Sequence, residues 1–382
     1  MAISSLDSLT NAITSGRFHR QDWNKNFLPT AAAVAGDWHH LFRGTGAPGA
    51  DSVANTGTNL AFQPLSYSTT NATGIYSGPD VGPMDKYLIN LSAGSGASTS
   101  MPAVLMLVDL VGFYRVTTVT TTTLQSFTNT LNVSYTFTAD ASTDICTHAF
   151  YQLKNYTCVR LTTSGTLPAG LATATDYFVI YLSNTTCRLA TSYANAVAGT
   201  YINITDAGTG THNITTLLPR YTNGDRVRKF AYNTNATAMG AATPTLDFRY
   251  TNTSFTGSRA TPATLPTCKS GAANGTVLYS GAGAGKYNPF VPLAAGDSGI
   301  TSVESIQLSA SYLSGEFSVM LCVPIVTIPM TTIGVWSERD CVNQMPSFPK
   351  IEDGACLSWL LMSGANTPTN TPYYGHLDMA WS

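Results

Sequence analysis

The chain has 382 residues, which is enough for one large domain or for two or three smaller ones. Only 10% of the residues are charged, against about 25% in a typical soluble domain, while 43% are hydrophobic and the formal net charge is −2. This balance excludes an intrinsically disordered chain, which is poor in hydrophobic residues, and a nucleic-acid binder, which needs clustered Lys and Arg. The 56 threonines are β-branched and carry a hydroxyl, so they favour strands whose outer face is solvent-exposed and polar without being charged.

Residues 1–45 are predicted to form a short helix followed by an extended arm. Apolar residues recur at helical spacing from Ile3 to Ile13, and Gly16 is a stop signal. The rest of the segment mixes aromatic and basic side chains without a clear period. Because such side chains anchor interfaces, we expect six of them to contact a neighbouring subunit. These six are Arg17, Arg20, Trp23, Phe27, Trp38 and Phe42. Docking of the aromatics onto the chain's own core is the open alternative, and removal of this segment should leave the β core folded.

Residues 46–132 and 217–382 are interpreted as one discontinuous main domain of the β-sandwich or jelly-roll type. Runs rich in Val, Ile, Tyr and Thr alternate with Gly/Pro turns, and no βαβ pattern occurs. The most hydrophobic stretch, residues 317–336, is long enough to cross a membrane, but Pro324 and Pro329 inside it would break a helix. We therefore expect two buried strands with bends there, and an all-β fold.

Residues 133–216 are predicted to be a small β domain inserted into the main one. The segment contains several short strand candidates, among them VSYTFTA, YFVIYLS and TCRLATS, which are separated by turns such as SGTLPAGL. Sequences that are predicted to form similar strands flank the segment on both sides. An insertion explains why the pattern of the main domain resumes after it.

Charge is concentrated in two places, the N-terminal segment and residues 338–353. The second stretch contains Arg339 and Asp340, which we expect to take part in contacts between subunits. The seven cysteines have scattered spacings without a CxxC pair, so we expect mostly buried, reduced thiols. A local disulfide stays open among three cysteines of the inserted segment, which are Cys146, Cys158 and Cys187.

Three short motifs suggest chemistry, but none meets the requirements of that chemistry. GDSG at residues 296–299 resembles a serine-protease nucleophile loop, yet no histidine stands in the matching context, and Asp-Ser-Gly is an ordinary turn. GAGAGK at residues 281–286 lacks the spacing and the Ser/Thr of a phosphate loop. His39 and His40 are adjacent, so on a strand they point to opposite faces and cannot hold one metal ion. We therefore expect no catalytic, cofactor-binding or metal site, and no enzyme.

The text of residues 159–215 resembles a small β module that is common in virion proteins of tailed bacteriophages. The resemblance rests on TSGTLPAGL, on the YFVI and CRLATS strands, and on the closing ITDAGTGTH. The flanks, including FHRQDWNKNF, LPRYTNGDRVRKF and SERDCVNQMPSFPKIEDGACLSWLLM, resemble a family of phage particle proteins. Members without the module would join TNTLN directly to LPRYTNG. Together these resemblances imply a structural protein of the virion.

From the resemblance we expect a decoration or cement protein that binds the outer surface of the capsid and bridges its subunits. Its expected partners are the major capsid protein and further copies of this chain, guessed to form a trimer, but neither nucleic acid nor a membrane. The N-terminal segment lacks the apolar stretch of a signal peptide, so we expect synthesis in the host cytoplasm and a final place on the capsid exterior. A tail, fibre or host-receptor-binding component is the alternative, while a secreted enzyme or adhesin and a major capsid protein fit less well.

Overall fold

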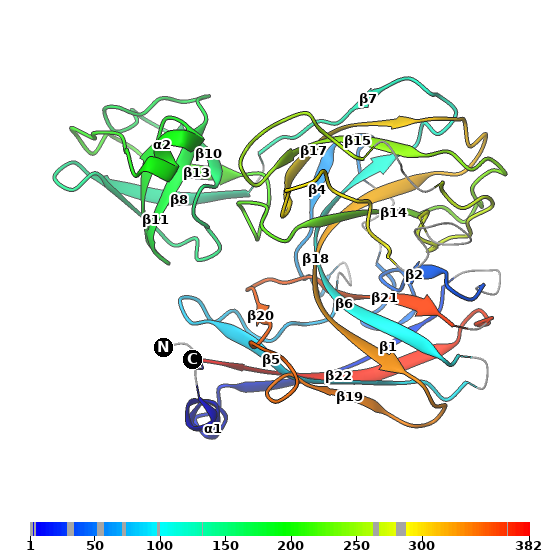
Figure 1. Cartoon of the computed structure of the whole chain (residues 1–382). Coiled ribbons are helices and arrows are strands. Elements are labelled where there is room, and N and C mark those ends of the chain that lie inside the picture. The colour runs from blue at the N-terminus through cyan, green and yellow to red at the C-terminus, as the bar shows by residue number, and fades with distance from the viewer. Residues whose placement is uncertain are drawn as a thin grey trace.

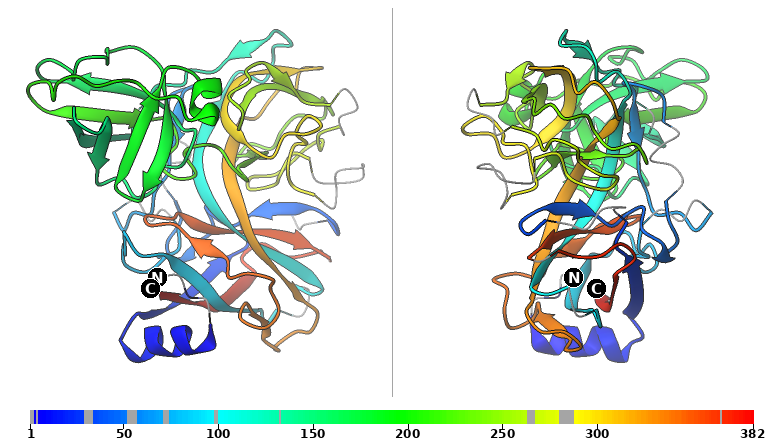
Figure 2. Two further views of the ribbon diagram at one scale, coloured as in Figure 1. Left: turned by 60° about the vertical axis from the view of Figure 1, so that its left-hand side comes forward. Right: turned by 90° about the vertical axis from the view of Figure 1, so that its right-hand side faces the viewer.

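Two long strands form the spine of the molecule. The computed structural model describes residues 3, 5–28, 34–51, 57–70, 74–97, 100–131, 133–262, 267–279, 288–364 and 366–382. The strands β6 (Ala103–Val116) and β18 (Phe317–Met330) pair antiparallel along their whole length and run through both halves of the molecule in Figures 1 and 2. The prediction of an all-β fold is confirmed, since the described residues form strands and only two short helices.

The spine belongs to a central sheet that serves both halves. The sheet has the order β14 (Arg228–Asn233), β18, β6, β21 (Leu357–Ser363) and β2 (Trp38–His40), and β4 (Phe62–Pro64) also pairs with β6. The pairing of β18 with β6 is irregular between Leu321 and Cys322 and between Pro324 and Val326. Such bulges change which residues face inward, and they admit a proline into a strand. The predicted pair of strands in residues 317–336 is therefore wrong, because one bent strand takes its place.

A second sheet packs against the part of the central sheet that lies at the bottom of Figure 1, and we call it the lower sheet. Its order is β19 (Ser337–Asp340), β5 (Lys86–Gly94), β22 (Pro372–Trp381), β1 (Phe18–Asn26) and β3 (Gly46–Ala47), and β20 (Lys350–Ile351) pairs with β5. The core between these two sheets includes Trp23, Leu91, Leu107, Ile328 and Trp359. The helix α1 (Leu6–Thr14) packs on the other side of the lower sheet, at the end near Ala380.

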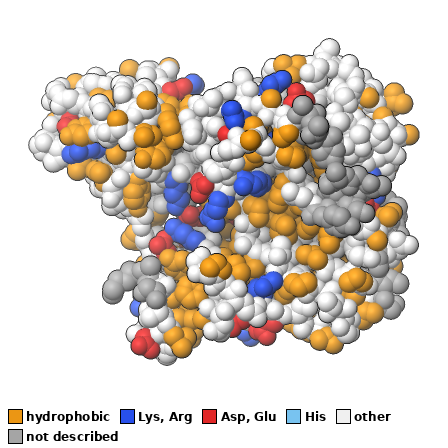
Figure 3. Space-filling model, in the orientation of Figure 1, with side chains coloured by type: hydrophobic (Ala, Val, Ile, Leu, Met, Phe, Trp, Pro, Cys, Tyr) orange, Lys and Arg blue, Asp and Glu red, His pale blue; other side chains and the backbone are white. Residues whose placement is uncertain are grey.

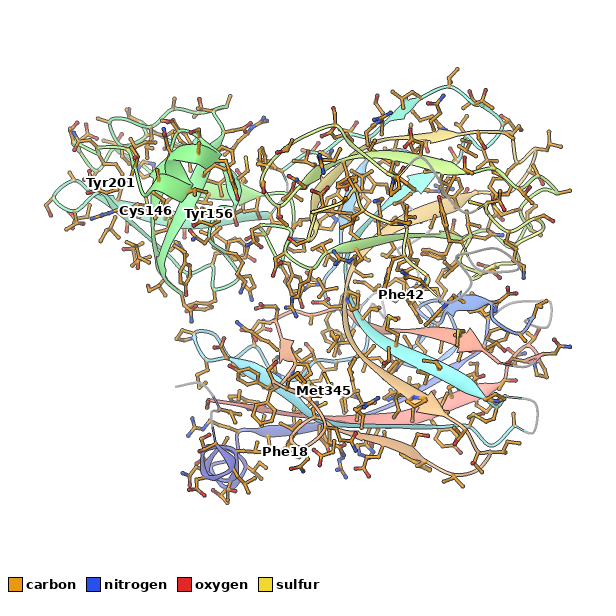
Figure 4. All side chains as sticks on the ribbon, in the orientation of Figure 1. Phe18, Phe42, Cys146, Tyr156, Tyr201 and Met345 are labelled. Atoms are coloured by element: carbon orange, nitrogen blue, oxygen red, sulfur yellow. The ribbon has the colours of Figure 1, made fainter. Side chains whose placement is uncertain are left out.

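The upper half is a similar pair of layers. The upper sheet has the order β16 (Arg259–Ala260), β15 (Leu246–Asn252), β17 (Ile300–Leu308) and β7 (Gln125–Ser126). It packs on the upper part of the central sheet over a core that includes Val111, Phe248, Val303 and Val319. A third cluster joins the halves, and Phe42 lies in it at the level where they meet (Figure 4). We call the two halves together the body.

The predicted N-terminal arm is instead part of the body's sheets. All nine residues of β1 pair with β22, and β2 pairs with β21. Trp23, Phe27, Trp38 and Phe42 are each at most 3% exposed, so they lie in the chain's own core and not on the surface that a subunit contact requires. Removal of residues 1–45 would take the paired strands β1 and β2 out of the sheets, so this pairing does not support the expectation that the β core folds without them.

Residues 133–216 form a closed six-stranded barrel beside the upper half (Figure 1). Its strands are, in barrel order, β10 (Cys158–Thr163), β11 (Tyr177–Ser183), β12 (Thr186–Ala190), β9 (Ile145–His148), β8 (Val133–Asp140) and β13 (His212–Thr216). The short helix α2 (Tyr193–Ala198), which the sequence analysis missed, follows β12. Val133 pairs with Thr216, so the chain enters and leaves the barrel at one point.

The seven cysteines form no disulfide in the structure. Cys146 and Cys187 are opposite each other on β9 and β12, inside the barrel (Figure 4). A hydrogen bond with Cys146 and burial both raise the pKa of Cys187 well above its ordinary value. Such a thiol stays protonated at neutral pH and is a poor nucleophile.

A buried ion pair joins the exit of the barrel to the spine. The guanidinium of Arg220 donates to both carboxylate oxygens of Asp109 at 2.7 and 2.9 Å, and both side chains are at most 1% exposed. Arg220 also donates to the carbonyls of Leu65 and Leu110, and the N–H of Cys356 donates to Asp109. Four segments of the chain therefore meet at one pair.

The charged stretch 338–353 also holds the barrel against the body. Lys154 of the barrel pairs with Glu352 at 2.9 Å, and Lys350 pairs with Asp85 at 2.7 Å. Figure 3 shows Lys, Arg, Asp and Glu side chains gathered where the barrel meets the body. Part of the charge that the sequence concentrates in this stretch therefore serves contacts within the chain.

Asp109→Asn is expected to lower the free energy of unfolding by about 3–5 kcal/mol, because it leaves the guanidinium of Arg220 buried without a counter-charge. Urea denaturation measures the change. The matched control is Asp225→Asn, whose pair with Arg226 is 3.9 Å apart with both side chains more than half exposed, and which should change the free energy by about 0.5 kcal/mol or less. Equal effects at the two sites would contradict the role given to the buried pair.

Trp23→Ala is expected to cost about 3–5 kcal/mol of stability. The Trp23 side chain is 2% exposed, and its ring centroid lies 4.8 Å from that of Trp359. Trp336→Ala removes the same side chain from a site that is 50% exposed, and it should cost about 0.5 kcal/mol or less. Thermal and urea unfolding of both variants make the comparison, and a Trp23 variant as stable as the Trp336 variant would restore the interpretation as a free arm.

Lys229 is expected to make stability rise with pH between about 7 and 10.5. Its ammonium lies 4.3 Å from the ring centroid of Tyr250, and burial lowers its pKa from the ordinary 10.5 to about 7. In this window the unfolded chain binds a proton that the folded chain has lost, so the free energy of unfolding increases as pH rises. Urea unfolding of the wild type and of Lys229→Met at pH 6.5 and 9.5 isolates the effect. The free energy of unfolding of the wild type, relative to that of the variant, should be larger at pH 9.5 than at pH 6.5. A relative free energy that does not change with pH would contradict the prediction.

Candidate interaction surface

The outer side of the lower sheet, away from the core, is the candidate site, and we call it the lower face. Side chains alternate along a strand, so every second residue of each strand points to this side. The register places these residues in rows across the sheet. The lower face comprises Arg20, Asp22 and Asn24 of β1, Tyr374, His376 and Asp378 of β22, Asn90 and Ser92 of β5, Glu338 and Asp340 of β19, and Trp336 just before β19.

One row brings together charged residues from the two ends of the chain. Arg20 donates through Nε and Nη2 to the two carboxylate oxygens of Asp378, each at 2.7 Å, and this contact raises the pKa of Arg20. In the same row Asn90 stands between Asp378 and Asp340, and its amide donates to Glu338 at 2.7 Å. A shallow hollow of about 340 Å³ lies over this acidic end. The charge of Arg20 is therefore paired within the row, while its side chain stays half exposed.

Asp340 also fixes the turn that follows β19. Its carboxylate accepts hydrogen bonds from the side chain of Asn343 and from the main-chain N–H groups of Asn343 and Val342. These bonds, the one from the Asn343 amide first, lower the pKa of Asp340. The carboxylate is thus ionised and held in a defined position.

The opposite end of the lower face is aromatic. Trp336, which is 50% exposed, packs on Tyr374 and on His376, with ring centroids 5.5 and 5.8 Å apart. Ile333 and Val335 precede it in the same loop and are 41% and 56% exposed. At the other end of the sheet, α1 leaves Leu6 exposed at 69%. Exposed apolar groups therefore flank the charged rows on both sides.

Ser92, His376 and Asp378 have the residue types of a catalytic triad, but their geometry does not activate a serine. The hydroxyl of Ser92 lies 2.8 Å from Nδ1 of His376, and it also accepts the main-chain N–H of the same residue. The Asp378 carboxylate is bound by Arg20 and lies 3.8 Å from Nε2 of His376, too far for the hydrogen bond that orients the imidazole. These contacts hold neighbouring strands together.

The eight residues predicted as contacts separate into four groups. Arg20 and Asp340 lie in one row of the lower face. Arg339 points to the opposite side of β19, where its guanidinium donates to the carbonyl of Thr327, because adjacent residues of a strand face opposite ways. Arg17 is half-buried between α1 and β1, and the four aromatic residues lie in the core described above.

The sequence analysis missed the partners of Arg20 on the last strand. In the C-terminal sequence YYGHLDMAWS, residues of the outer side alternate with residues of the inner side of the sheet. Tyr374, His376 and Asp378 are the outer ones, at every second position. That period of two was a usable strand signal. The exposed Trp336 had no such signal, because it lies in a loop at the end of an apolar run.

The remaining motifs have structural explanations or lie outside the described residues. Asp297 of GDSG accepts hydrogen bonds from Tyr250, Asn252 and Arg259, and so fastens its loop to the upper sheet. His39 and His40 are buried, and burial lowers the pKa of His39 to about 3. GAGAGK at 281–286 lies outside the described residues. Within the described residues, no group of three or more His, Cys, Asp or Glu is placed to hold a metal ion, and no helix is long and apolar enough to cross a membrane.

Comparisons with known proteins do not assign the chain to a family. No protein-family model matches the sequence, and no curated protein matches it significantly. The function therefore has to be argued from the resemblance in the sequence and from the surfaces of the folded chain.

Proposed function

We propose that this chain is a structural protein of a tailed-bacteriophage virion that binds the outer surface of the capsid as a decoration protein. The resemblance of residues 159–215 and of the flanking segments to phage particle proteins supports the virion role. The proposed partners are the major capsid protein, through the lower face, and further copies of this chain.

The lower face is the observation that carries the proposal. Its rows contain charges of both signs, and apolar side chains as large as Leu6 and Trp336 stand exposed at its ends. Protein interfaces combine aromatic and Arg anchors with a polar surround, and hydrophobic side chains gathered on a surface mark such interfaces. Binding of a capsid subunit would remove these groups from water and leave the internally paired charges to fix the orientation.

A tail, fibre or host-receptor-binding component is the second candidate function. The groove between barrel and body that is described below favours it. The number of copies per particle separates the two candidates, because a decoration protein is present in hundreds of copies and a tail component in a handful. Band densities of purified virions measure this number, and native mass spectrometry of the free protein tests the expected trimer.

The double variant Leu6→Ser/Trp336→Ala is expected to bind capsids at least about tenfold more weakly than the wild type, because it removes apolar anchors at both ends of the lower face. Co-sedimentation of the purified protein with virions that lack it measures the binding. Both side chains are exposed, so the fold should be unaffected.

The matched control is Leu313→Ser/Tyr201→Ala, which removes exposed side chains from the upper half and from the barrel. It should bind capsids as the wild type does. The lower face is refuted as the capsid-binding surface if both double variants bind equally well, or if only the control loses binding.

A further inference from the structure

A groove runs between the barrel and the body. It contains a hollow of about 430 Å³ that both the barrel and the body line, and it adjoins a hollow of about 690 Å³ that barrel residues alone line. Ala149 and Tyr151 line both hollows, so the two lie side by side. The ring of Tyr151 lies against Gly82, in the space that a Cβ atom there would occupy. The groove shares no lining residue with the lower face.

The barrel wall of the groove offers hydroxyl groups. Thr138 and Thr147 are register partners on β8 and β9, and both side chains are exposed. Three further threonines, Thr136, Thr185 and Thr211, line the same hollow, and none of the described residues that line it is Lys, Arg, Asp or Glu. A hydroxyl both donates and accepts hydrogen bonds, so this wall suits a ligand that is itself rich in hydroxyls.

His148 follows Thr147 on β9 but is buried, at 5% exposure, opposite the buried Phe137. Its Nδ1 accepts the main-chain N–H of Phe150, which assigns the proton of the neutral ring to Nε2. Burial lowers the pKa of His148, so the ring is neutral near pH 7. Among the described residues none accepts a hydrogen bond from Nε2, although this atom is buried. Because this atom is buried, a ligand in the hollow does not reach it, and the threonine hydroxyls are the hydrogen-bonding groups of this wall.

The hollow between barrel and body is lined by aromatic rings of the barrel and by carboxylates of the body. Tyr135 is 36% exposed and stacks on Phe150 at a centroid distance of 3.9 Å, which fixes its ring. Asp80 and Asp353 also line this hollow and accept main-chain N–H groups across it. The guanidinium of Arg220 lines it as well, but its charge is already paired with Asp109. Asp353 also pairs with Lys86 at 3.5 Å. Asp80 therefore leaves the net charge of this hollow negative, which disfavours an anionic ligand.

We propose that this groove binds a neutral glycan. The apolar faces of its sugar rings would pack on Tyr135 and Tyr151, and its hydroxyls would bond to the threonine wall and to the carboxylates. Each hollow falls in the size range of ligand sites, which occur preferentially where two domains meet. This site is separate from capsid binding, since the lower face takes no part in it.

The groove is fixed before any ligand binds. Lys154 of the barrel pairs with Glu352 of the body, and the side chain of Asn184 donates to the carbonyl of Pro83 at 2.8 Å. On the same side, Thr157 and Thr222 are in hydrogen-bond contact at 2.6 Å. A preformed site loses little conformational entropy on binding, which favours recognition of a flexible glycan.

The test is isothermal titration calorimetry of the full chain with three neutral tetrasaccharides, maltotetraose, cellotetraose and tetraacetylchitotetraose. Tetragalacturonate is the anionic comparison. At least one neutral tetrasaccharide should bind with a dissociation constant in the micromolar to millimolar range, and tetragalacturonate should bind more weakly. Thr138→Val/Thr147→Val should weaken the binding at least about tenfold, because it removes two hydroxyls without changing side-chain shape. Thr162→Val, at an exposed site on β10, is the matched control and should bind as the wild type does.

Three results would each overturn the proposal. These are the absence of binding by all three neutral tetrasaccharides, binding of tetragalacturonate as tight as that of the best neutral one, and equal affinity of the double valine variant and the wild type. Co-sedimentation of the double valine variant with capsids tests the proposed capsid binding separately from the proposed glycan binding. It should remain at the wild-type level whatever the calorimetry shows, because a failure of the glycan site leaves the lower face intact.

Discussion

The arrangement of the molecule depends on the buried pair of Arg220 and Asp109. A desolvated carboxylate is tolerated inside a protein only where an opposite charge reaches it in good geometry. Here that charge comes from the segment that leaves the barrel, while further hydrogen bonds come from Leu65 and Cys356. Any arrangement in which these segments fail to meet leaves a charge or a main-chain group buried and unpaired. The pair thereby fixes where the barrel's exit, the spine and two connecting segments lie relative to one another.

The all-β fold could be predicted because Val, Ile, Tyr and Thr recur in short runs between turn residues. The N-terminal strand could not, because Lys25 stands where the alternation of Trp23 and Phe27 requires an inward residue. Lys25 is 3% exposed, and its ammonium donates to three main-chain carbonyls. Burial lowers its pKa to about 8. A lysine in this position conceals the period of two, and only the tertiary structure shows which groups solvate it.

The candidate surfaces depend on distances that the sequence does not contain. Asp109 is the only charged residue in the apolar run 101–114, which signals a buried partner, but that partner stands 111 positions later. Arg20 and Asp378 are 358 positions apart and meet only because β1 and β22 pair. The groove likewise takes its walls from segments between residues 66 and 354. Local patterns predict strands, whereas the packing of distant strands decides which polar groups face one another.

The pairing of Val133 with Thr216 has a consequence for the evolution of the molecule. Because the ends of the barrel are adjacent, the body closes over the same short gap whether the intervening chain is long or short, and the entropy of closure changes little with its length. This position is therefore an insertion point for a further domain on the body. A different unit with adjacent ends can occupy it without changing the course of β6 or β17, so the inserted domain can be exchanged through one continuous stretch of the gene.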